Sequence, residues 1–123
     1  MKIILDVENT TTKRDGKLHL DPFEPGNSLT LVGVLDCLKD ESQIFVFDHT
    51  ERKITDDDSD TKLQAILDKT ELLIGHNLQY DLQWLWSCGF KYDGPIFDTM
   101  LGDYVLQRGQ KGSVSLENCA IRY

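Results

Sequence analysis

The chain begins with a short apolar run that ends in two carboxylates, KIILDVEN at residues 2–9. The run predicts a strand over residues 2–7 with apolar side chains on both faces, which is typical of a central strand. Because the side chains of a strand alternate between its faces, Asp6 and Glu8 are expected to project from the same face. Two carboxylates so close together repel each other and are costly to desolvate. Either this strand end is open to water, or a favourable interaction offsets the repulsion.

The other segments predict an α/β domain. Residues 10–28 are rich in turn-forming residues and predict a loop or a hairpin. Further strands are predicted at residues 29–38, 43–48 and 71–75, helices at 61–70, 77–88, 98–107 and 113–123, a connection at 91–97, and polar or flexible linkers at 50–60 and 108–113. This order favours a mixed sheet with antiparallel strands first and a helical crossover to a later strand. Sites in open α/β sheets form at strand ends, where Asp6 and Glu8 lie.

The bulk composition limits the classes of function. A length of 123 residues is enough for one domain with a real core. The net charge of −8 argues against unaided attraction to nucleic acid or to anionic membranes, but divalent cations at the contact would still admit a nucleic-acid substrate. An odd number of cysteines without a secretion signal predicts reduced thiols and a cytoplasmic location. No stretch approaches transmembrane length.

A second unusual segment is GHNLQYDLQWL, at residues 75–85. On a helix, Asn77 and Asp81 share a face that is offset from the leucine stripe. Taken alone, Asn77 is well placed as an N-cap and Asp81 reads as an exposed aspartate. Taken with Asp6 and Glu8, Asp81 completes a set of three carboxylates that could converge on one point. Oxygen-only ligands suit Mg²⁺ or Mn²⁺, and two such ions can promote phosphodiester hydrolysis.

Four segments, LDVEN, HNLQYDLQWL, IFDTMLGDYVL and SVSLENCAIRY, occur in the order found in DEDD-type 3'-5' exonucleases. The chain most resembles the proofreading domain of DNA polymerase I-like (family A) polymerases, with ribonuclease D as a more distant relative. The resemblance runs from residue 2 to residue 121 and implies a ribonuclease H-like fold. It implies one exonuclease domain over residues 1–123, acting on single-stranded DNA 3' ends in replication. The product in the family is a nucleoside 5'-monophosphate.

The resemblance also implies roles for individual residues. Asp6 would bridge two Mg²⁺ or Mn²⁺ ions, Glu8 would bind the ion that carries the attacking water, and Asp81 would bind the other ion. Glu8 is also expected to contact the 3'-terminal nucleotide. Asn77 and the backbone near Thr10 would help to position that nucleotide.

One family motif is missing from the sequence. The family takes a fourth carboxylate from a late helix, in a Tyr-x-x-x-Asp or His-x-x-x-Asp motif, and no Tyr or His here has Asp four residues later. We therefore expect a partial domain whose late helices are absent. The chain would be a shortened piece, the product of a split gene in a bacterial or phage-infected cell, or a non-catalytic remnant, and the sequence does not choose among these.

Two other functions stay open. A non-catalytic module that binds DNA ends or a polymerase chain is the main alternative, and it predicts an exposed apolar surface where the late helices would pack. An RNA exonuclease of the ribonuclease D type is the weaker one.

Several other residues have simple structural readings. His76 reads as a structural histidine, Asp98 as the N-cap of the following helix, and Tyr80 as a packing residue. The acidic run at residues 56–60 reads as a solvated loop and helix cap rather than a calcium loop.

Overall fold

The computed structural model describes residues 1–47, 59–108 and 112–123. Its elements are β1 (Lys2–Asn9), β2 (Thr12–Arg14), β3 (Lys17–His19), β4 (Leu29–Asp36), β5 (Glu41–Val46), α1 (Ser59–Asp68), β6 (Leu72–Gly75), α2 (Leu78–Ser87), β7 (Ile96–Asp98), α3 (Thr99–Leu106) and α4 (Leu116–Arg122). Three predictions fall on residues outside the described ranges: the strand residue Asp48, residues 50–58 of the predicted polar linker, and residues 109–111 of the linker predicted at 108–113.

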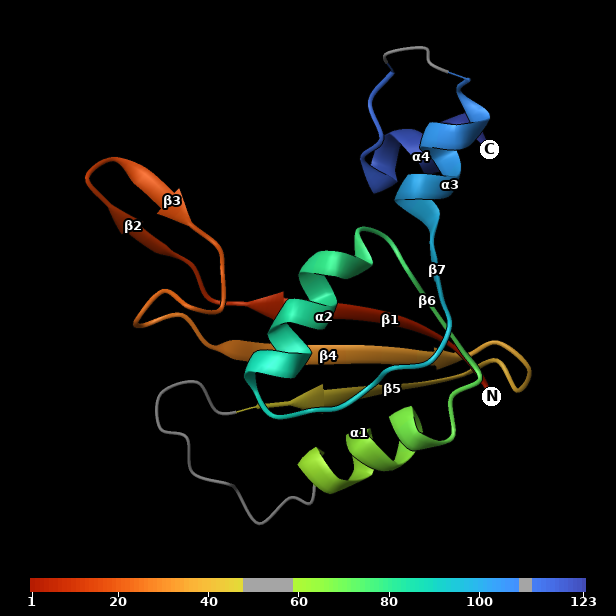
Figure 1. The fold of residues 1–123 in the computed structure, drawn as a ribbon, viewed down its shortest axis with the longest axis horizontal. Helices are drawn as coiled ribbons and strands as arrows, with labels where there is room; N and C mark the ends of the chain where they lie inside the picture. Colours follow the sequence, from red (N-terminus) through yellow and green to blue (C-terminus); the bar gives the residue numbers. More distant parts are fainter. Residues whose placement is uncertain (48–58, 109–111) are drawn as a thin grey trace.

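A five-stranded mixed sheet in the order β5-β4-β1-β6-β7 forms the centre of the molecule (Figure 1). Strand β1 runs antiparallel to β4 and parallel to β6, while β4 and β5 form the predicted antiparallel hairpin. The mixed α/β sheet and the central position of the first strand are therefore confirmed. Only one face of β1 is buried, because Ile3, Leu5 and Val7 are buried whereas the residues that alternate with them, including the apolar Ile4, are exposed. The buried leucines of α1 and α2 belong to the same hydrophobic core as the buried face of β1.

The helices bury the residues that the sequence spacing predicts. Helix α1 buries Leu63 and Leu67, and α2 buries Leu78, Leu82 and Leu85 along one stripe. Complete burial of a leucine side chain contributes roughly 1.5–3 kcal/mol, so the stripe fixes which side of α2 faces the sheet. The helix ends just before Gly89, whose φ of +93° suits the left-handed conformation of a helix C-terminus.

Residues 91–97 do not form the simple connection expected from the sequence. Strand β7 begins at Ile96 and pairs in parallel with β6, so that Phe97 lies beside Ile74 and Asp98 beside Gly75. A three-residue strand is too short to show a periodic pattern, and Gly94 and Pro95 just before it indicate a loop. The consequence for the site is that Asp98 comes to the edge of the sheet where β6 ends.

Residues 12–19 form a β-hairpin that projects beyond the carboxyl end of β1 (Figure 1). Its two turn residues, Asp15 and Gly16, have φ values of 53° and 77°. Positive φ at both central residues is the type I′ geometry that matches the twist of a two-residue hairpin. Of the two readings that the sequence allowed for this region, the hairpin is therefore correct.

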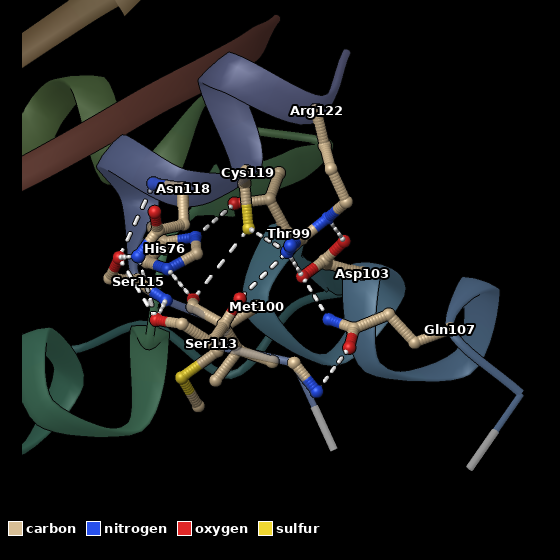
Figure 2. A network of polar contacts seen from close by, with 12 residues as sticks. His76, Thr99, Met100, Asp103, Gln107, Ser113, Ser115, Asn118, Cys119 and Arg122 are labelled. Carbon is tan, nitrogen blue, oxygen red and sulfur yellow. Dashed lines mark hydrogen bonds and ion pairs between the residues drawn. The ribbon is translucent and has the colours of Figure 1, made fainter. Parts of the chain in front are cut away.

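Helices α3 and α4 form a small layer that polar contacts hold to the end of β6 (Figure 2). The Nε2 atom of His76 lies 2.7 Å from the carbonyl oxygen of Val114, and its Nδ1 atom lies 2.9 Å from the hydroxyl of Thr99. Arg122 of α4 forms an ion pair with Asp103 of α3. His76 is thus a structural residue, as the sequence indicated, and it anchors the segment that leads into α4.

Candidate functional site

The candidate site lies where β1 and β6 separate. The parallel pairing of these strands covers three residue pairs and ends with Ile4 beside Ile74, whereas the antiparallel pairing of β1 with β4 continues to Asn9. Asp6 and Glu8 therefore belong to a stretch of β1 that has a strand neighbour on one side only. On the other side β6 has ended, and the chain turns into α2. Crevices at the carboxyl ends of strands in open α/β sheets are the usual position of ligand sites.

Asp6 and Glu8 lie on the same face of β1, and both are exposed. Asp6 is opposite Gly33 and Glu8 is opposite Leu31, and the register with β4 shifts between Glu8 and Asn9. Such a bulge bends a strand and redirects the side chains beside it. The first of the two outcomes expected from the sequence thus holds in this structure, because the carboxylates at the strand end are open to water.

Asp81 is the exception among the three candidate carboxylates because it is buried, with 4 % of its surface exposed. Its Oδ2 atom has no hydrogen-bond partner among the residues that the structure describes. Burial, followed by the charges of Asp6, Asp98 and Glu8, raises the pKa of Asp81 to about 8. The reading of Asp81 as an exposed aspartate is therefore wrong. The structure brings its carboxyl group within electrostatic range of the two carboxylates on β1.

Asp98 is the residue of this region whose importance the sequence showed only in part. One of its oxygens accepts hydrogen bonds from the backbone N–H groups of Asn77 and Met100, both at 2.9 Å, and the other accepts from Leu78 at 3.0 Å. The predicted cap of the following helix is confirmed. The same side chain also holds the start of α2, the helix that carries Asp81.

Asn77 does not cap α2 with its side chain, so that expectation is wrong. It adopts a left-handed conformation with φ of 60° and ψ of 53°, which asparagine tolerates better than most residues. The backbone N–H of Asn77 donates to the side chain of Asp98. The exposed amide side chain of Asn77 makes no capping hydrogen bond at the start of α2.

The polar groups of Thr10 are directed at a neighbouring loop. Its N–H donates to the carbonyl oxygen of Ser28 at 2.8 Å, and its hydroxyl accepts from the N–H of Ser28 at 2.7 Å. In this structure, therefore, the backbone N–H of Thr10 is engaged within the protein.

The chemistry of these donors fits a hard divalent cation. The side chains of Asp6, Glu8 and Asp81 all offer carboxylate oxygens. The buried Oδ2 atom of Asp81 makes no hydrogen bond to the described residues that metal binding would have to break. Within residues 1–47, 59–108 and 112–123, however, no three His, Cys, Asp or Glu side chains are grouped closely enough to hold a metal ion as they stand. The structure thus shows converging negative charge rather than a closed set of ligands.

A comparison with sequence models of protein families identifies a match to a 3'-5' exonuclease family over residues 23–123. The chain belongs to the 3'-5' exonuclease domain family of family A DNA polymerases. The resemblance seen in the sequence is therefore confirmed, and the mixed sheet with flanking helices agrees with the ribonuclease H-like fold expected for this exonuclease domain. No curated protein matches the chain.

The matched range of the exonuclease domain includes Asn77, Asp81 and Asp98 but begins after β1. Asp6 and Glu8 therefore lie outside it, and their assignment rests on their place in the fold. Within the part of the chain that the structure covers, no helix is long and apolar enough to cross a membrane.

Proposed function

We propose that this exonuclease domain is a divalent-metal-dependent nuclease that removes nucleotides from the 3' end of single-stranded DNA as nucleoside 5'-monophosphates. Its role would be proofreading beside a family A DNA polymerase in the cytoplasm of a bacterial or phage-infected cell. The observation that carries the proposal is the buried Asp81, which has an unpartnered oxygen and lies within the electrostatic influence of Asp6 and Glu8. Burial of a carboxyl group among like charges is unfavourable for folding alone, and perturbed groups of this kind gather at functional sites.

Asp6, Glu8 and Asp81 would hold two Mg²⁺ or Mn²⁺ ions. When bound, the ions would supply an activated water and charge stabilisation at the phosphodiester. Asp6 and Glu8 present their carboxylates on an exposed strand face that a DNA end can approach. Asp98 fixes the first turn of α2, so it is a positioning residue for Asp81. The exposed amide of Asn77 lies beside this turn and would orient the terminal nucleotide together with the loop at Thr10.

The proposal includes a further segment that supplies a fourth carboxylate. Support comes from α3, which has an unusual orientation: of its eight residues, all described, only Asp103 is buried. Large apolar side chains of β7, α3 and α4 are exposed instead: Ile96, Phe97, Leu101, Tyr104, Val105, Leu106, Leu116, Ile121 and Tyr123. We refer to these nine side chains as the apolar surface. Helix α3 contacts both β7 and α4, and apolar side chains exposed on adjoining elements mark contacts with other segments or partners. A segment that carries Tyr-x-x-x-Asp, in the same polypeptide or in a second chain, would cover this surface.

Degradation of 3'-labelled single-stranded DNA tests the proposal. We expect activity with Mg²⁺ or Mn²⁺, loss of activity with a chelator, and a decrease of at least about 100-fold for Asp6→Asn, because a ligand to both ions loses its charge. Asp93→Asn, an exposed aspartate of the loop before β7, is the matched control and should be fully active. Activity that is indifferent to the chelator and to Asp6→Asn would exclude the proposal. Parallel assays with RNA separate a DNA exonuclease from one of the ribonuclease D type.

The apolar surface also favours a second candidate, a non-catalytic module that binds DNA ends or assembles with a polymerase chain. This function predicts DNA binding without degradation at any divalent-ion concentration. Addition of a chain that carries Tyr-x-x-x-Asp separates the two candidates. Cleavage that appears only in the mixture indicates a split enzyme, whereas complex formation without cleavage indicates an assembly module.

A further inference from the structure

The β2–β3 hairpin carries positive charge in an otherwise acidic protein. Residues 12–19 contain three Lys or Arg residues and one Asp, a local excess of two positive charges, whereas the whole chain has a net charge of −8. Lys13 and Lys17 are exposed, and the side-chain ammonium group of neither has an ion-pair or hydrogen-bond partner among the described residues. Arg14 lies directly opposite Lys17 in the hairpin and forms an ion pair with Glu24 at 3.1 Å. The hairpin therefore presents two ammonium groups that have no partner among the described residues, one on each of its faces, because Lys13 lies opposite Leu18 and Lys17 lies opposite Arg14.

The loop that follows the hairpin presents an aromatic side chain. Phe23 is 76 % exposed, although its backbone N–H is fixed by a 2.9 Å hydrogen bond to the side chain of Asp21. Asn27 holds the same loop, because its side chain donates to the carbonyl oxygens of His19 and Asp21 and accepts from the hydroxyl of Thr12. The loop is thus well ordered by its own hydrogen bonds, yet it leaves a phenyl ring in water.

Hydrogen bonds connect the β2–β3 hairpin and the loop after it to the candidate site. The hydroxyl of Tyr80 donates to the side-chain oxygen of Asn9 at 2.6 Å and lies 3.1 Å from the carbonyl oxygen of Leu20. Tyr80 precedes Asp81 on α2, and Asn9 ends the strand that carries Glu8. The base of the hairpin is therefore held at the same end of β1 as the candidate carboxylates, as Figure 1 shows for the elements.

We propose that the β2–β3 hairpin and the loop after it bind the single-stranded DNA on the 5' side of its terminal nucleotide. In this proposal, which rests on the proposed function, Lys13 and Lys17 contact phosphates and Phe23 stacks on a base. A strand whose 3' end reaches the carboxylates must leave the site along its 5' direction, and most of this acidic surface repels phosphate. A pair of unpartnered cations with an exposed aromatic ring is the combination by which proteins bind single strands without reading sequence.

Binding of a 5'-fluorescein-labelled (dT)12 oligonucleotide to the 123-residue chain tests the proposal. Fluorescence anisotropy is recorded in EDTA, which prevents metal-dependent cleavage, over a series of NaCl concentrations. For single strands, the slope of log K against log salt changes by about 0.7 for each phosphate contact. The double variant Lys13→Gln/Lys17→Gln should therefore lower the magnitude of the slope by about 1.4. The matched control is Lys62→Gln/Lys69→Gln, two exposed lysines on or next to α1, and it should leave the slope unchanged.

Variants of Phe23 test the stacking contact separately. Phe23→Ala should weaken binding roughly 5- to 150-fold, the range for loss of one base–aromatic stack, with the salt slope unchanged. Phe23→Trp should retain the affinity, which a general loss of folding would not allow.

The outcomes separate this proposal from the exonuclease proposal. Absence of measurable binding, an unchanged slope in Lys13→Gln/Lys17→Gln, or an equal decrease in the control pair would each overturn the hairpin as the DNA contact. If cleavage of labelled single-stranded DNA is instead indifferent to EDTA and to Asp6→Asn, the metal-dependent exonuclease assignment fails by itself. A slope that depends on the hairpin without any cleavage supports the DNA contact and contradicts only the assigned activity.

Discussion

Asp98 holds in place the start of the helix that carries Asp81, and its negative charge opposes ionisation of the Asp81 carboxyl group. Its side chain accepts the first backbone N–H groups at the start of α2, the helix on which Asp81 lies, and its charge is one of the three that raise the pKa of Asp81. One carboxylate therefore fixes the geometry of another while opposing its ionisation. This combination is unfavourable for the isolated fold and has an explanation if a cation is bound nearby.

Removal of this cap should weaken two helices at once. Asp98→Ala leaves the N–H groups of Asn77, Leu78 and Met100 without their acceptor, so we expect a loss of about 1–3 kcal/mol in the free energy of unfolding. Urea denaturation followed by circular dichroism measures the change. Asp93→Asn, which caps no helix, should change stability by less than about 0.5 kcal/mol. Equal stability of Asp98→Ala and the native protein would show that the three hydrogen bonds contribute nothing.

Neutralising Asp81 should stabilise the metal-free protein. In EDTA at pH 7, Asp81→Asn keeps the size of the side chain and removes a carboxyl group whose pKa burial, Asp6, Asp98 and Glu8 raise from 3.8 to about 8. Because a raised carboxyl pKa destabilises the fold at every pH above the unfolded value, a gain on the order of 2 kcal/mol is expected at pH 7, and it should shrink as the pH falls toward 3.8. Addition of Mn²⁺ should raise the melting temperature of the native protein more than that of the variant. A variant that is less stable in EDTA, or that gains as much from Mn²⁺, would contradict this account of the site.

The contact between α3 and α4 should weaken in strong acid. Burial raises the pKa of Asp103, but hydrogen bonds led by that from Arg122 outweigh this effect and lower the pKa from 3.8 to about 2. Because the folded-state pKa is the lower one, the stabilisation is complete above pH 3.8 and is lost as the pH falls through about 2. NMR signals of the Arg122 side chain should titrate in this window. The variant Asp103→Asn should abolish this titration, and a midpoint near pH 4 in the native protein would exclude the proposed ion pair.

Polar substitutions on the apolar surface should be tolerated by the fold. Val105→Lys and Leu106→Glu change exposed side chains of α3, so stability should change by less than about 0.5 kcal/mol while self-association and binding of hydrophobic dyes decrease. In contrast, Leu82→Ala removes a buried side chain of α2 and should cost about 2–5 kcal/mol. Analytical ultracentrifugation and thermal unfolding provide the two readouts. A large loss of stability in Val105→Lys would mean that this surface is part of the core.

Gly75 has no room for a side chain. A Cβ atom there would lie 2.9 Å from Cγ of Leu78 and 3.1 Å from the carbonyl oxygen of Leu5. We expect Gly75→Ala to cost about 1–3 kcal/mol, because the start of α2 must move away from β1. Exonuclease activity should decrease with it, since Asp81 lies on that helix. In the double variant Gly75→Ala/Leu78→Ala the overlap is smaller, so the second substitution should cost less than Leu78→Ala alone, as a double-mutant cycle would show.

The sequence predicted the parts of this molecule that have strong local signals. The apolar run around Leu5 and the leucine spacing of α2 each specify an element without help from distant residues. For residues 10–28 the turn-forming residues left a loop or a hairpin open, and the turn at Asp15 and Gly16 was seen only in the structure. Strand β7 could not be predicted, because its three residues acquire their conformation by pairing with β6. The double capping by Asp98 depends on that pairing and was missed for the same reason.

In the candidate site, too, the feature set by local sequence was predicted correctly and the feature set by long-range packing was not. The alternation of β1 placed Asp6 and Glu8 on one face correctly. The burial of Asp81 could not be read from the helix pattern, because it depends on where α2 lies relative to the end of β1 rather than on the residues of α2 alone. The roles of all three in metal binding stay predictions.

The early end of the pairing between β1 and β6 has a mechanical consequence. Beyond Ile4 and Ile74 no ladder hydrogen bond joins the two strands, so no hydrogen bond of the sheet opposes a small change in the distance between Asp6 and the first turn of α2. Small rotations that draw α2 toward β1 leave the sheet intact. If Asp6, Glu8 and Asp81 hold a cation as proposed, their carboxylates would be able to approach it without breaking a hydrogen bond between β1 and β6.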